Sequence, residues 1–164
     1  SLENRARFLL EVTQAAMSVW GPDRVGVRVT PSGRYGSMAD SNRPATFRYV
    51  ASELDRLGAG YLHVVPPRIG GDAEPNPVDA GTPRQVFSRT IIAAGGFDRQ
   101  SAEALLTSGK ADLIAFGRSF LANPDLVERL RQNWPLNSYD RSTFYGGDAR
   151  GYTDYPFYAD AAQH

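Results

Sequence analysis

The sequence predicts an α/β fold built on a parallel sheet. Four short apolar runs, at about residues 25–29, 61–65, 91–94 and 113–116, are continuous and do not alternate with polar residues, which is typical of buried parallel strands. Segments whose apolar residues are spaced by three and four separate these runs and indicate amphipathic helices. The alternation of the two patterns predicts a sheet with helices covering both of its faces.

The first two helices are marked by their ends. In the first helix Leu9 and Val12 begin the helical spacing, and Gly21 stops it. The second helix opens near Pro44 and closes at Gly58, because proline is favoured at a helix start and glycine just past a helix end. Both helices precede a predicted strand.

The later helices are shorter. A helix from about 99 to 108 should turn Ala102, Leu105 and Leu106 inward, and Asn123 and Pro124 have the residue types for the N-cap and first position of a last helix. Residues 68–83 are rich in Gly, Pro and Asp without periodicity, so we expect a long loop there. The aromatic and acidic tail, 134–164, is expected to pack over the end of the fold, in one domain spanning 1–164.

Composition excludes several classes of function. The 164 residues carry 18 Lys and Arg against 18 Asp and Glu, so the basic excess of a nucleic-acid-binding domain is missing. The absence of cysteine removes disulfides, thiolate metal sites and cysteine nucleophiles, and fits a reducing compartment. No signal peptide and no apolar run of the roughly 20 residues that span a bilayer are visible. We therefore expect a cytoplasmic protein with no nucleic-acid or membrane partner.

Two strands end in glycine, which predicts an anion site. Gly95 and Gly96 allow backbone N–H groups to approach an anion closely, and Gly117 does the same beside Arg118, whose guanidinium can bind a phosphate with two hydrogen bonds. Ligands of parallel α/β folds bind at these carboxyl ends of strands. The alternative is that the glycines only make tight turns and that Arg118 forms a surface ion pair.

Two further polar residues lie within strands. Arg28 interrupts an apolar run, so it must face a ligand or a carboxylate partner. His63 is interpreted as a hydrogen-bonded core residue, because no second histidine lies near it in the chain to form a metal site. The sequence contains none of the common hydrolase, metalloprotease or nucleotide motifs, so we expect no catalytic residue and no metal site in this chain, and an enzyme built on it would depend on a cofactor.

Several ordered motifs along the whole chain resemble the C-terminal half of the Old Yellow Enzyme family. Those motifs are Ser1-Leu2-Glu3-Asn4-Arg5-Ala6-Arg7-Phe8, Val25-Gly26-Val27-Arg28-Val29-Thr30-Pro31, Phe116-Gly117-Arg118, Ala122-Asn123-Pro124-Asp125-Leu126, Thr143-Phe144-Tyr145 and Gly151-Tyr152-Thr153-Asp154-Tyr155-Pro156. The family consists of FMN-dependent ene-reductases on a (β/α)₈ TIM barrel. The resemblance implies that this chain supplies strands five to eight and the helix before strand five.

The resemblance also implies roles for individual residues. Arg28 matches the arginine that faces the flavin pyrimidine at N1 and the C2 carbonyl, where a reduced flavin gains negative charge. The two glycine turns, with Arg118, match the turns that hold the flavin phosphate. Phe144 matches a residue beside the flavin, and Tyr145 matches an aromatic on the substrate side of the ring. The family often has asparagine where Gly96 stands, so only a backbone contact is expected there.

The family's substrate-activating pair and its tyrosine proton donor belong to the N-terminal half. We therefore expect a split, cleaved or permuted chain that is inactive alone and needs a complementary N-terminal half-barrel polypeptide. With that partner it would use FMN and NAD(P)H to reduce alkenes activated by a carbonyl or nitro group. The alternatives are a non-enzymatic half-barrel that pairs with itself around a residual flavin or phosphate site, and a different phosphate-binding barrel enzyme.

Overall fold

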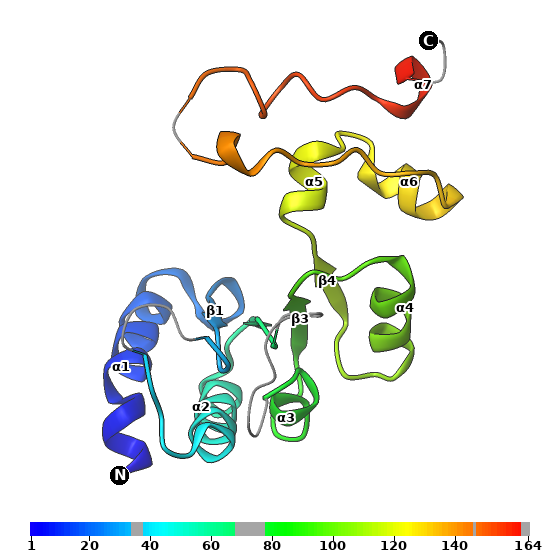
Figure 1. The fold of residues 1–164 in the computed structure, drawn as a ribbon. Helices are drawn as coiled ribbons and strands as arrows, with labels where there is room; N and C mark the ends of the chain where they lie inside the picture. Colours follow the sequence, from blue (N-terminus) through cyan, green and yellow to red (C-terminus); the bar gives the residue numbers. More distant parts are fainter. Residues whose placement is uncertain (34–37, 68–77, 146, 162–164) are drawn as a thin grey trace. The chain divides into compact units, whose positions relative to one another are not determined.

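The computed structural model describes residues 1–33, 38–67, 78–145 and 147–161. The chain divides into two compact units, Ser1–Ala115 and Phe116–His164. The ribbon of each unit can be followed by its colours in Figure 1.

A four-stranded parallel sheet forms the centre of the N-terminal unit. Its strands follow the order of the sequence: β1 (Gly26–Val29), β2 (Tyr61–Val64), β3 (Thr90–Ala94) and β4 (Leu113–Ala115). Each strand lies within a residue or so of its predicted position. In this sheet β1 pairs only with β2, and β4 only with β3, so the two outer strands each leave one edge unpaired.

The first two helices of this unit end where the sequence predicted, and the first begins earlier than its predicted apolar spacing. Ser1 caps the first helix, Gly21 follows its end, and Gly58 adopts the left-handed conformation, with φ of 80°, after the second. Figure 1 shows the helical elements of this unit before the first strand and between successive strands. They are α1 (Leu2–Trp20), the 3₁₀ turn η1 (Pro22–Arg24), α2 (Arg43–Leu57), the short α3 (Gly81–Arg84) and α4 (Arg99–Thr107).

Two details of these helices differ from the prediction. The helix α3 overlaps the end of the segment predicted as a long loop, whose residues 68–77 are outside the described part of the chain. In α4, Ala102 is buried and Leu105 packs against the core, but Leu106 is 39% exposed. The inward orientation predicted for Leu106 is therefore wrong, because a helix of nine residues turns only a narrow stripe toward the sheet.

The two faces of the sheet differ in burial. One face forms the core with α1 and α2, and its side chains alternate along each strand with those of the other face. The buried face consists of Val29, Leu62, Val64, Ile91 and Ala93. On the opposite face, which we call the open face, the side chains are partly or largely exposed; they include Arg28, Tyr61, His63, Ile92 and Leu113.

The open face corrects the expectation that helices cover the sheet on both sides. Among the described residues of this unit, no helix packs over Tyr61 or Leu113, which are 41% and 53% exposed. In a closed (β/α)₈ barrel the helices form only an outer ring, and the inner face is filled by side chains from the other strands. Four consecutive strands of such a barrel would therefore have helices on one face and no cover on the other.

The C-terminal unit consists of short helices and a long, mostly extended tail. Its elements are α5 (Arg118–Ala122), α6 (Leu126–Gln132), η2 (Arg141–Thr143) and α7 (Tyr158–Ala161). The last predicted helix is present as α6, but its N-cap is Asp125 and not Asn123. Asn123 is fully buried, and its side-chain amide makes two hydrogen bonds. The amide NH₂ donates to the Ser119 carbonyl (2.8 Å), and the amide oxygen accepts from the Asn137 N–H (2.7 Å). These tertiary hydrogen bonds use the side chain that a cap would need.

A buried arginine holds the tail of this unit together. Arg129 is 2% exposed, and its guanidinium donates to Asp125 (2.6 Å) and to the carbonyls of Pro135 (2.8 Å) and Pro156 (3.0 Å). It also lies over the ring of Tyr158, which stacks on Trp134 at 4.4 Å. A buried charge needs such a set of partners, so Arg129 fixes two separate stretches of the tail to α6.

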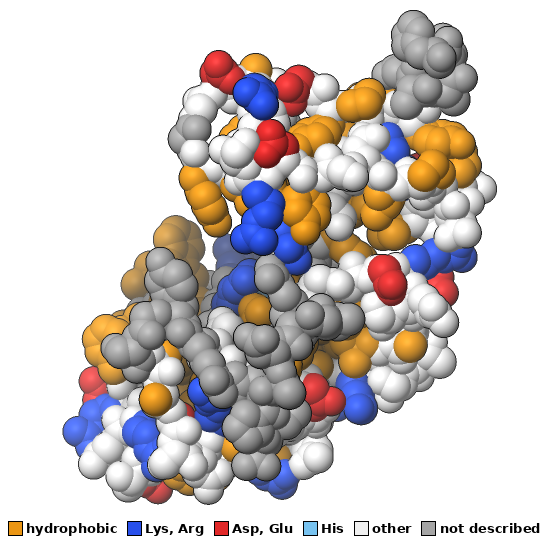
Figure 2. Space-filling model, in the orientation of Figure 1, with side chains coloured by type: hydrophobic (Ala, Val, Ile, Leu, Met, Phe, Trp, Pro, Cys, Tyr) orange, Lys and Arg blue, Asp and Glu red, His pale blue; other side chains and the backbone are white. Residues whose placement is uncertain are grey.

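Hydrophobic side chains remain at the surface of both units, where they are interspersed with charged ones (Figure 2). In the C-terminal unit the most exposed aromatic is Tyr145, at 90%. Within the described residues, no helix is long and apolar enough to cross a membrane.

Candidate functional site

The predicted site residues of the N-terminal unit lie at one edge of its sheet. Arg28 is close to the carboxyl end of β1, and Gly95 and Gly96 follow β3 directly. All four strands are parallel, so these ends meet at the same edge of the sheet. The structure therefore brings Arg28 and the first glycine turn to one side of this unit.

Arg28 projects from the open face and is exposed. Among the described residues, no carboxylate forms a hydrogen bond or an ion pair with it. Of the two alternatives for Arg28, a carboxylate partner within the described chain is therefore excluded. A guanidinium without an internal counter-charge is suited to an anionic or electron-rich ligand.

His63 is the register partner of Arg28 on β2. Burial lowers the pKa of the His63 imidazole, and the positive charge of Arg28 lowers it further. The imidazole is therefore neutral at pH 7. Its Nε2 atom is buried and has no hydrogen-bond partner among the described residues, so the prediction of a hydrogen-bonded core histidine is wrong for this atom.

The glycine turn after β3 has the conformation that glycine provides. Gly96 has φ of 84°, in the left-handed region that other residues rarely adopt. A Cβ atom on Gly95 would lie 3.4 Å from Cγ of Pro66, which follows β2. The turn therefore runs close against the neighbouring loop at the carboxyl edge of the sheet.

The second glycine turn opens the C-terminal unit. Gly117 is the N-cap of α5, and a Cβ atom there would meet nothing within 4 Å in the described structure. Arg118 donates from Nη1 to the Tyr139 hydroxyl at 3.0 Å, and its guanidinium carbon lies 5.2 Å from the centre of the Tyr139 ring. The predicted alternative of a surface ion pair for Arg118 finds no carboxylate partner among the described residues.

The aromatic candidates lie next to this arginine. The Tyr139 ring packs 5.5 Å from Phe144, which meets Tyr145 edge to face at 6.5 Å. The Tyr152 hydroxyl donates to the Phe144 carbonyl at 2.5 Å and fixes the backbone there. The C-terminal unit therefore places Arg118, Phe144 and Tyr145 in one chain of contacts through Tyr139.

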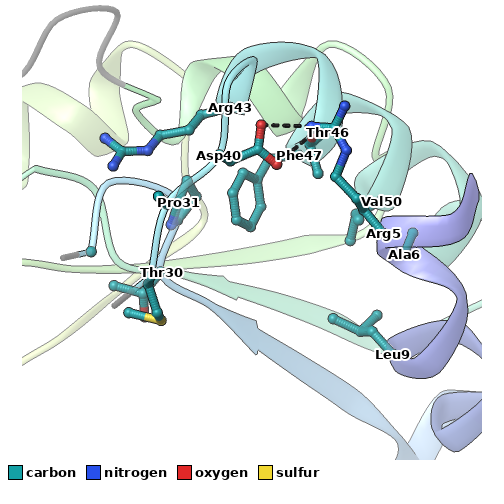
Figure 3. Close-up of a pocket in the computed structure, with 13 residues that line it drawn as sticks. Arg5, Ala6, Leu9, Thr30, Pro31, Asp40, Arg43, Thr46, Phe47 and Val50 are labelled. Carbon is teal, nitrogen blue, oxygen red and sulfur yellow. Dashed lines mark hydrogen bonds and ion pairs between the residues drawn. The ribbon is translucent and has the colours of Figure 1, made fainter. Parts of the chain in front are cut away.

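A pocket of about 340 Å³ lies between α1, α2 and the segment after β1 (Figure 3). Figure 3 shows Arg5, Asp40 and Thr46 directed toward one another beside the Phe47 ring. Asp40 accepts from Arg5 (2.8 Å) and from the Thr46 hydroxyl (2.9 Å), and it also accepts from the Asn42 N–H (2.7 Å). Burial raises the pKa of Asp40, but these hydrogen bonds outweigh it and hold the pKa below its ordinary value. The network ties the starts of α1 and α2 to the segment that follows β1.

Sequence reasoning did not find Tyr139 or Asp40. Tyr139 lies in a tail with many aromatics, and only its contact with Arg118 distinguishes it. For Asp40, the signal in the sequence is its place two residues before Asn42, the helix N-cap. Among the described residues no group of His, Cys, Asp or Glu is arranged to hold a metal ion.

Comparison with known proteins identifies the family. The model of the NADH:flavin oxidoreductase / NADH oxidase family matches residues 1–137. The chain belongs to this family. The expected resemblance to the Old Yellow Enzymes is confirmed, and FMN is the cofactor that the family uses, with a nicotinamide as the reductant.

Relatives of this oxidoreductase family match almost all of the chain. The chain is 46% identical over 160 residues to a putative 12-oxophytodienoate reductase 11 of Oryza sativa subsp. japonica, covering 96% of this chain and 44% of that protein. It is 43% identical over 159 residues to 12-oxophytodienoate reductase 2 of Arabidopsis thaliana, covering 95% and 42%. The chain therefore spans less than half the length of these relatives.

Solved structures of the same family show the same fold. Morphinone reductase superposes with a TM-score of 0.89 at 47% identity, covering 98% of this chain and 43% of that one. The old yellow enzyme from Trypanosoma cruzi gives 0.89 at 34% identity, covering 96% and 41%. The predicted fold, a partial (β/α)₈ barrel, is thereby confirmed. A different phosphate-binding barrel enzyme, the third alternative, is excluded.

The residues of this chain fit the FMN that the family implies. Arg28 and Arg118 are cations without carboxylate partners among the described residues, and the space beyond Gly117 is open in the same part of the chain. The orphaned Nε2 of His63 marks a polar group on the open face beside Arg28. A flavin phosphate and an electron-rich pyrimidine are the kinds of group that such cations and backbone donors bind.

Proposed function

We propose that this chain is the C-terminal half of an ene-reductase that acts when a complementary N-terminal half-barrel polypeptide completes the barrel. The assembled enzyme would use FMN and NAD(P)H to reduce activated C=C bonds of α,β-unsaturated carbonyl or nitro compounds. The observation that carries the proposal is the open face of the sheet, which presents Arg28 and the register partner His63 without a covering layer among the described residues of the N-terminal unit.

The need for a partner is supported by the edges of the sheet and by the length of the relatives. The outer strands β1 and β4 each leave one row of backbone N–H and C=O groups unpaired within the described sheet, and four more strands would close it. The relatives are more than twice as long as the stretch that this chain matches, with 42–44% of their length covered. The family's proton donor belongs to the half that this chain does not match.

When bound, FMN would supply the hydride for the activated alkene. Arg28 would face the flavin pyrimidine at N1 and the C2 carbonyl, and its fixed positive charge would stabilise the negative charge of the reduced ring. Because the His63 imidazole is neutral, the Arg28 guanidinium carries the main positive charge at that position on the open face. Arg28 therefore acts on the redox balance of the site as well as on binding.

The two glycine turns would hold the flavin phosphate. The backbone N–H groups of Gly95 and Gly96 and of Gly117 would donate to its oxygens, and the Arg118 guanidinium would add a charge-assisted pair of hydrogen bonds. Phe144 would lie beside the flavin, and the exposed Tyr145 would contact the alkene on the substrate side. No catalytic proton donor is assigned to this chain.

Reconstitution tests the proposal. The chain is mixed with the N-terminal half of a related ene-reductase and FMN, and reduction of cyclohexenone by NADPH or NADH is followed at the nicotinamide absorbance. We expect a yellow complex that turns over, while the chain alone with FMN does not. Two folded and associated halves that bind FMN without any turnover would contradict the proposed activity.

A second candidate is a non-enzymatic half-barrel that pairs with itself, since a second copy could also cover the open face and the edges of β1 and β4. Native mass spectrometry separates the two proposals. A stable homodimer that excludes the N-terminal half favours self-pairing, whereas a heterodimer of the two halves favours the enzyme. We place the assembled enzyme in the cytoplasm, since a chain without cysteine suits a reducing compartment.

A further inference from the structure

We propose that Tyr139 is a positioning residue for Arg118, which it holds in place for the phosphate of the flavin without neutralising its charge. The inference rests on the proposed role of Arg118 in the flavin site. It assigns a function to a tail residue that no family motif quoted above includes.

Tyr139 restrains Arg118 by two different contacts. Its hydroxyl accepts a hydrogen bond from Nη1 at 3.0 Å, and its ring lies 5.2 Å from the guanidinium carbon, within the range of a cation–π interaction. A hydrogen bond fixes one end of the guanidinium, and a ring contact limits the direction of its plane. Together the two contacts restrict the conformations of the Arg118 side chain before the ligand binds. Less conformational entropy is then lost on binding.

The partner of Arg118 is neutral, which distinguishes it from three other arginines of this unit. Each of the arginines 129, 131 and 150 is paired with a carboxylate, those of Asp125, Glu128 and Asp140 respectively. Arg118 has no such partner among the described residues. A guanidinium has five N–H donors, and the phenol occupies one, so the charge and most of the donors remain for an anion.

Tyr139 also connects the arginine to the aromatic candidates. Its ring packs on Phe144 at 5.5 Å, and Phe144 meets Tyr145 at 6.5 Å. The Tyr139 hydroxyl accepts from Arg118, so the phenolic hydrogen can itself be donated to a phosphate oxygen. One side chain therefore sets both the anion-binding group and the neighbouring aromatic pair.

The test compares FMN with riboflavin, which lacks the phosphate. The variants are Tyr139→Phe, which keeps the ring and loses the hydroxyl, and Tyr139→Leu, which loses both contacts. A matched control is Tyr158→Leu, because Tyr158 makes the other arginine–ring contact of this unit, with Arg129 at 5.6 Å. Dissociation constants are measured by flavin fluorescence on the chain assembled with its N-terminal half, and thermal unfolding checks that each variant is folded.

We expect Tyr139→Leu to weaken FMN binding about tenfold and Tyr139→Phe about threefold. Riboflavin binding should stay within about twofold in Tyr139→Phe, which keeps the ring on Phe144, and should fall less than FMN binding in Tyr139→Leu. The control should lower the stability and leave the ratio of FMN to riboflavin affinity as it is. Equal losses for FMN and riboflavin, or no loss for FMN in Tyr139→Leu, would overturn the inference.

A second measurement on the chain alone keeps the inference separate from the proposed function. The resonance of the Arg118 Nη1 hydrogens, assigned by its absence in Arg118→Lys, should be protected from solvent exchange in the wild type and should lose that protection in Tyr139→Leu. If the assembled protein binds neither flavin, the proposed function fails, and this resonance still decides the inference. Equal protection in the wild type and in Tyr139→Leu would overturn it.

Discussion

Arg28 on β1 and His63 on β2 are register partners on the open face of the sheet, and the arginine shares with burial the lowering of the histidine pKa. Below the ordinary pKa of 6.5 the unfolded chain binds a proton at His63 that the folded chain does not bind. Falling pH therefore favours unfolding from pH 6.5 down to the lowered pKa.

The first prediction follows from this sign. Replacing His63 by Asn should flatten the dependence of the free energy of unfolding on pH between about 7 and 5, since the variant has no proton to take up at this position. Urea denaturation at several pH values measures it. In Arg28→Gln, the His63 pKa measured by NMR titration should rise toward its ordinary value. Equal pH dependence in the wild type and in His63→Asn would show that the histidine does not contribute.

The second prediction concerns Arg28 itself. Arg28→Ala should weaken FMN binding to the assembled protein by about tenfold or more and slow reduction of the flavin, because a charge-assisted contact to the ring is lost. Arg28→Lys should retain part of the effect, since it keeps the charge without the planar fork. The midpoint potential of the bound flavin should fall in Arg28→Ala. An unchanged potential would return Arg28 to a purely structural role.

The third prediction concerns the network of Asp40 beside the pocket. Asp40→Asn should lower the free energy of unfolding by about 1–2 kcal/mol. The Arg5 side chain is 41% exposed, so its ion pair with Asp40 contributes less than the hydrogen bonds from Thr46 and Asn42. The lowered pKa makes this contribution complete above the ordinary value of 3.8 and removes it as pH falls through the folded-state pKa.

Urea denaturation at pH 7 and pH 3 measures the Asp40 effect. A matched control is Glu53→Gln, which removes an exposed ion pair with Arg56 on the surface of α2 and should change the stability by less than about 1 kcal/mol. A difference between Asp40→Asn and the wild type that persists undiminished at pH 3 would contradict the assignment.

The fourth prediction concerns the buried arginine of the C-terminal unit. Arg129→Ala should destabilise residues 116–161 by about 3–5 kcal/mol, because it leaves Asp125 and two carbonyls without their donor in a buried place. Hydrogen exchange followed by mass spectrometry should show faster exchange in this unit and little change in β1 to β4. Arg131→Ala, which breaks an exposed pair with Glu128, serves as the control. Equal effects of the two substitutions would contradict the role of Arg129.

Local sequence patterns predicted the helices and strands well, but they did not predict which faces of the sheet are covered. Period and end signals placed α1, α2 and the four strands, because the residues that stop a helix, such as Gly21 and Gly58, act within a few residues of themselves. The open face could not be predicted from these patterns, because Tyr61 and Leu113 are as apolar as the buried residues beside them. Their exposure reflects the lack of a covering layer over this face among the described residues of the N-terminal unit, which no local pattern encodes.

The errors at single residues have a tertiary cause. Asn123 has the side chain of an N-cap but is used by Asn137, fourteen positions further along the chain. The neutral partner of Arg118 is likewise supplied by Tyr139, twenty-one positions away. The motifs of the sequence identified Arg28, Arg118 and the glycines as candidates, whereas the residues that hold them are set by contacts between distant segments.

Because the edges of β1 and β4 are unpaired within the described sheet, the stability of this fold should depend on the concentration of any partner that covers them. A partner that binds only the folded chain adds a stabilisation of about 2.7 kcal/mol when its free concentration is 100 times its dissociation constant. The melting temperature should accordingly rise with the concentration of whatever covers those edges, and dilution alone should loosen the sheet. Unpaired edges of this kind can also pair with the wrong strand, so a chain whose edges stay uncovered is prone to aggregation.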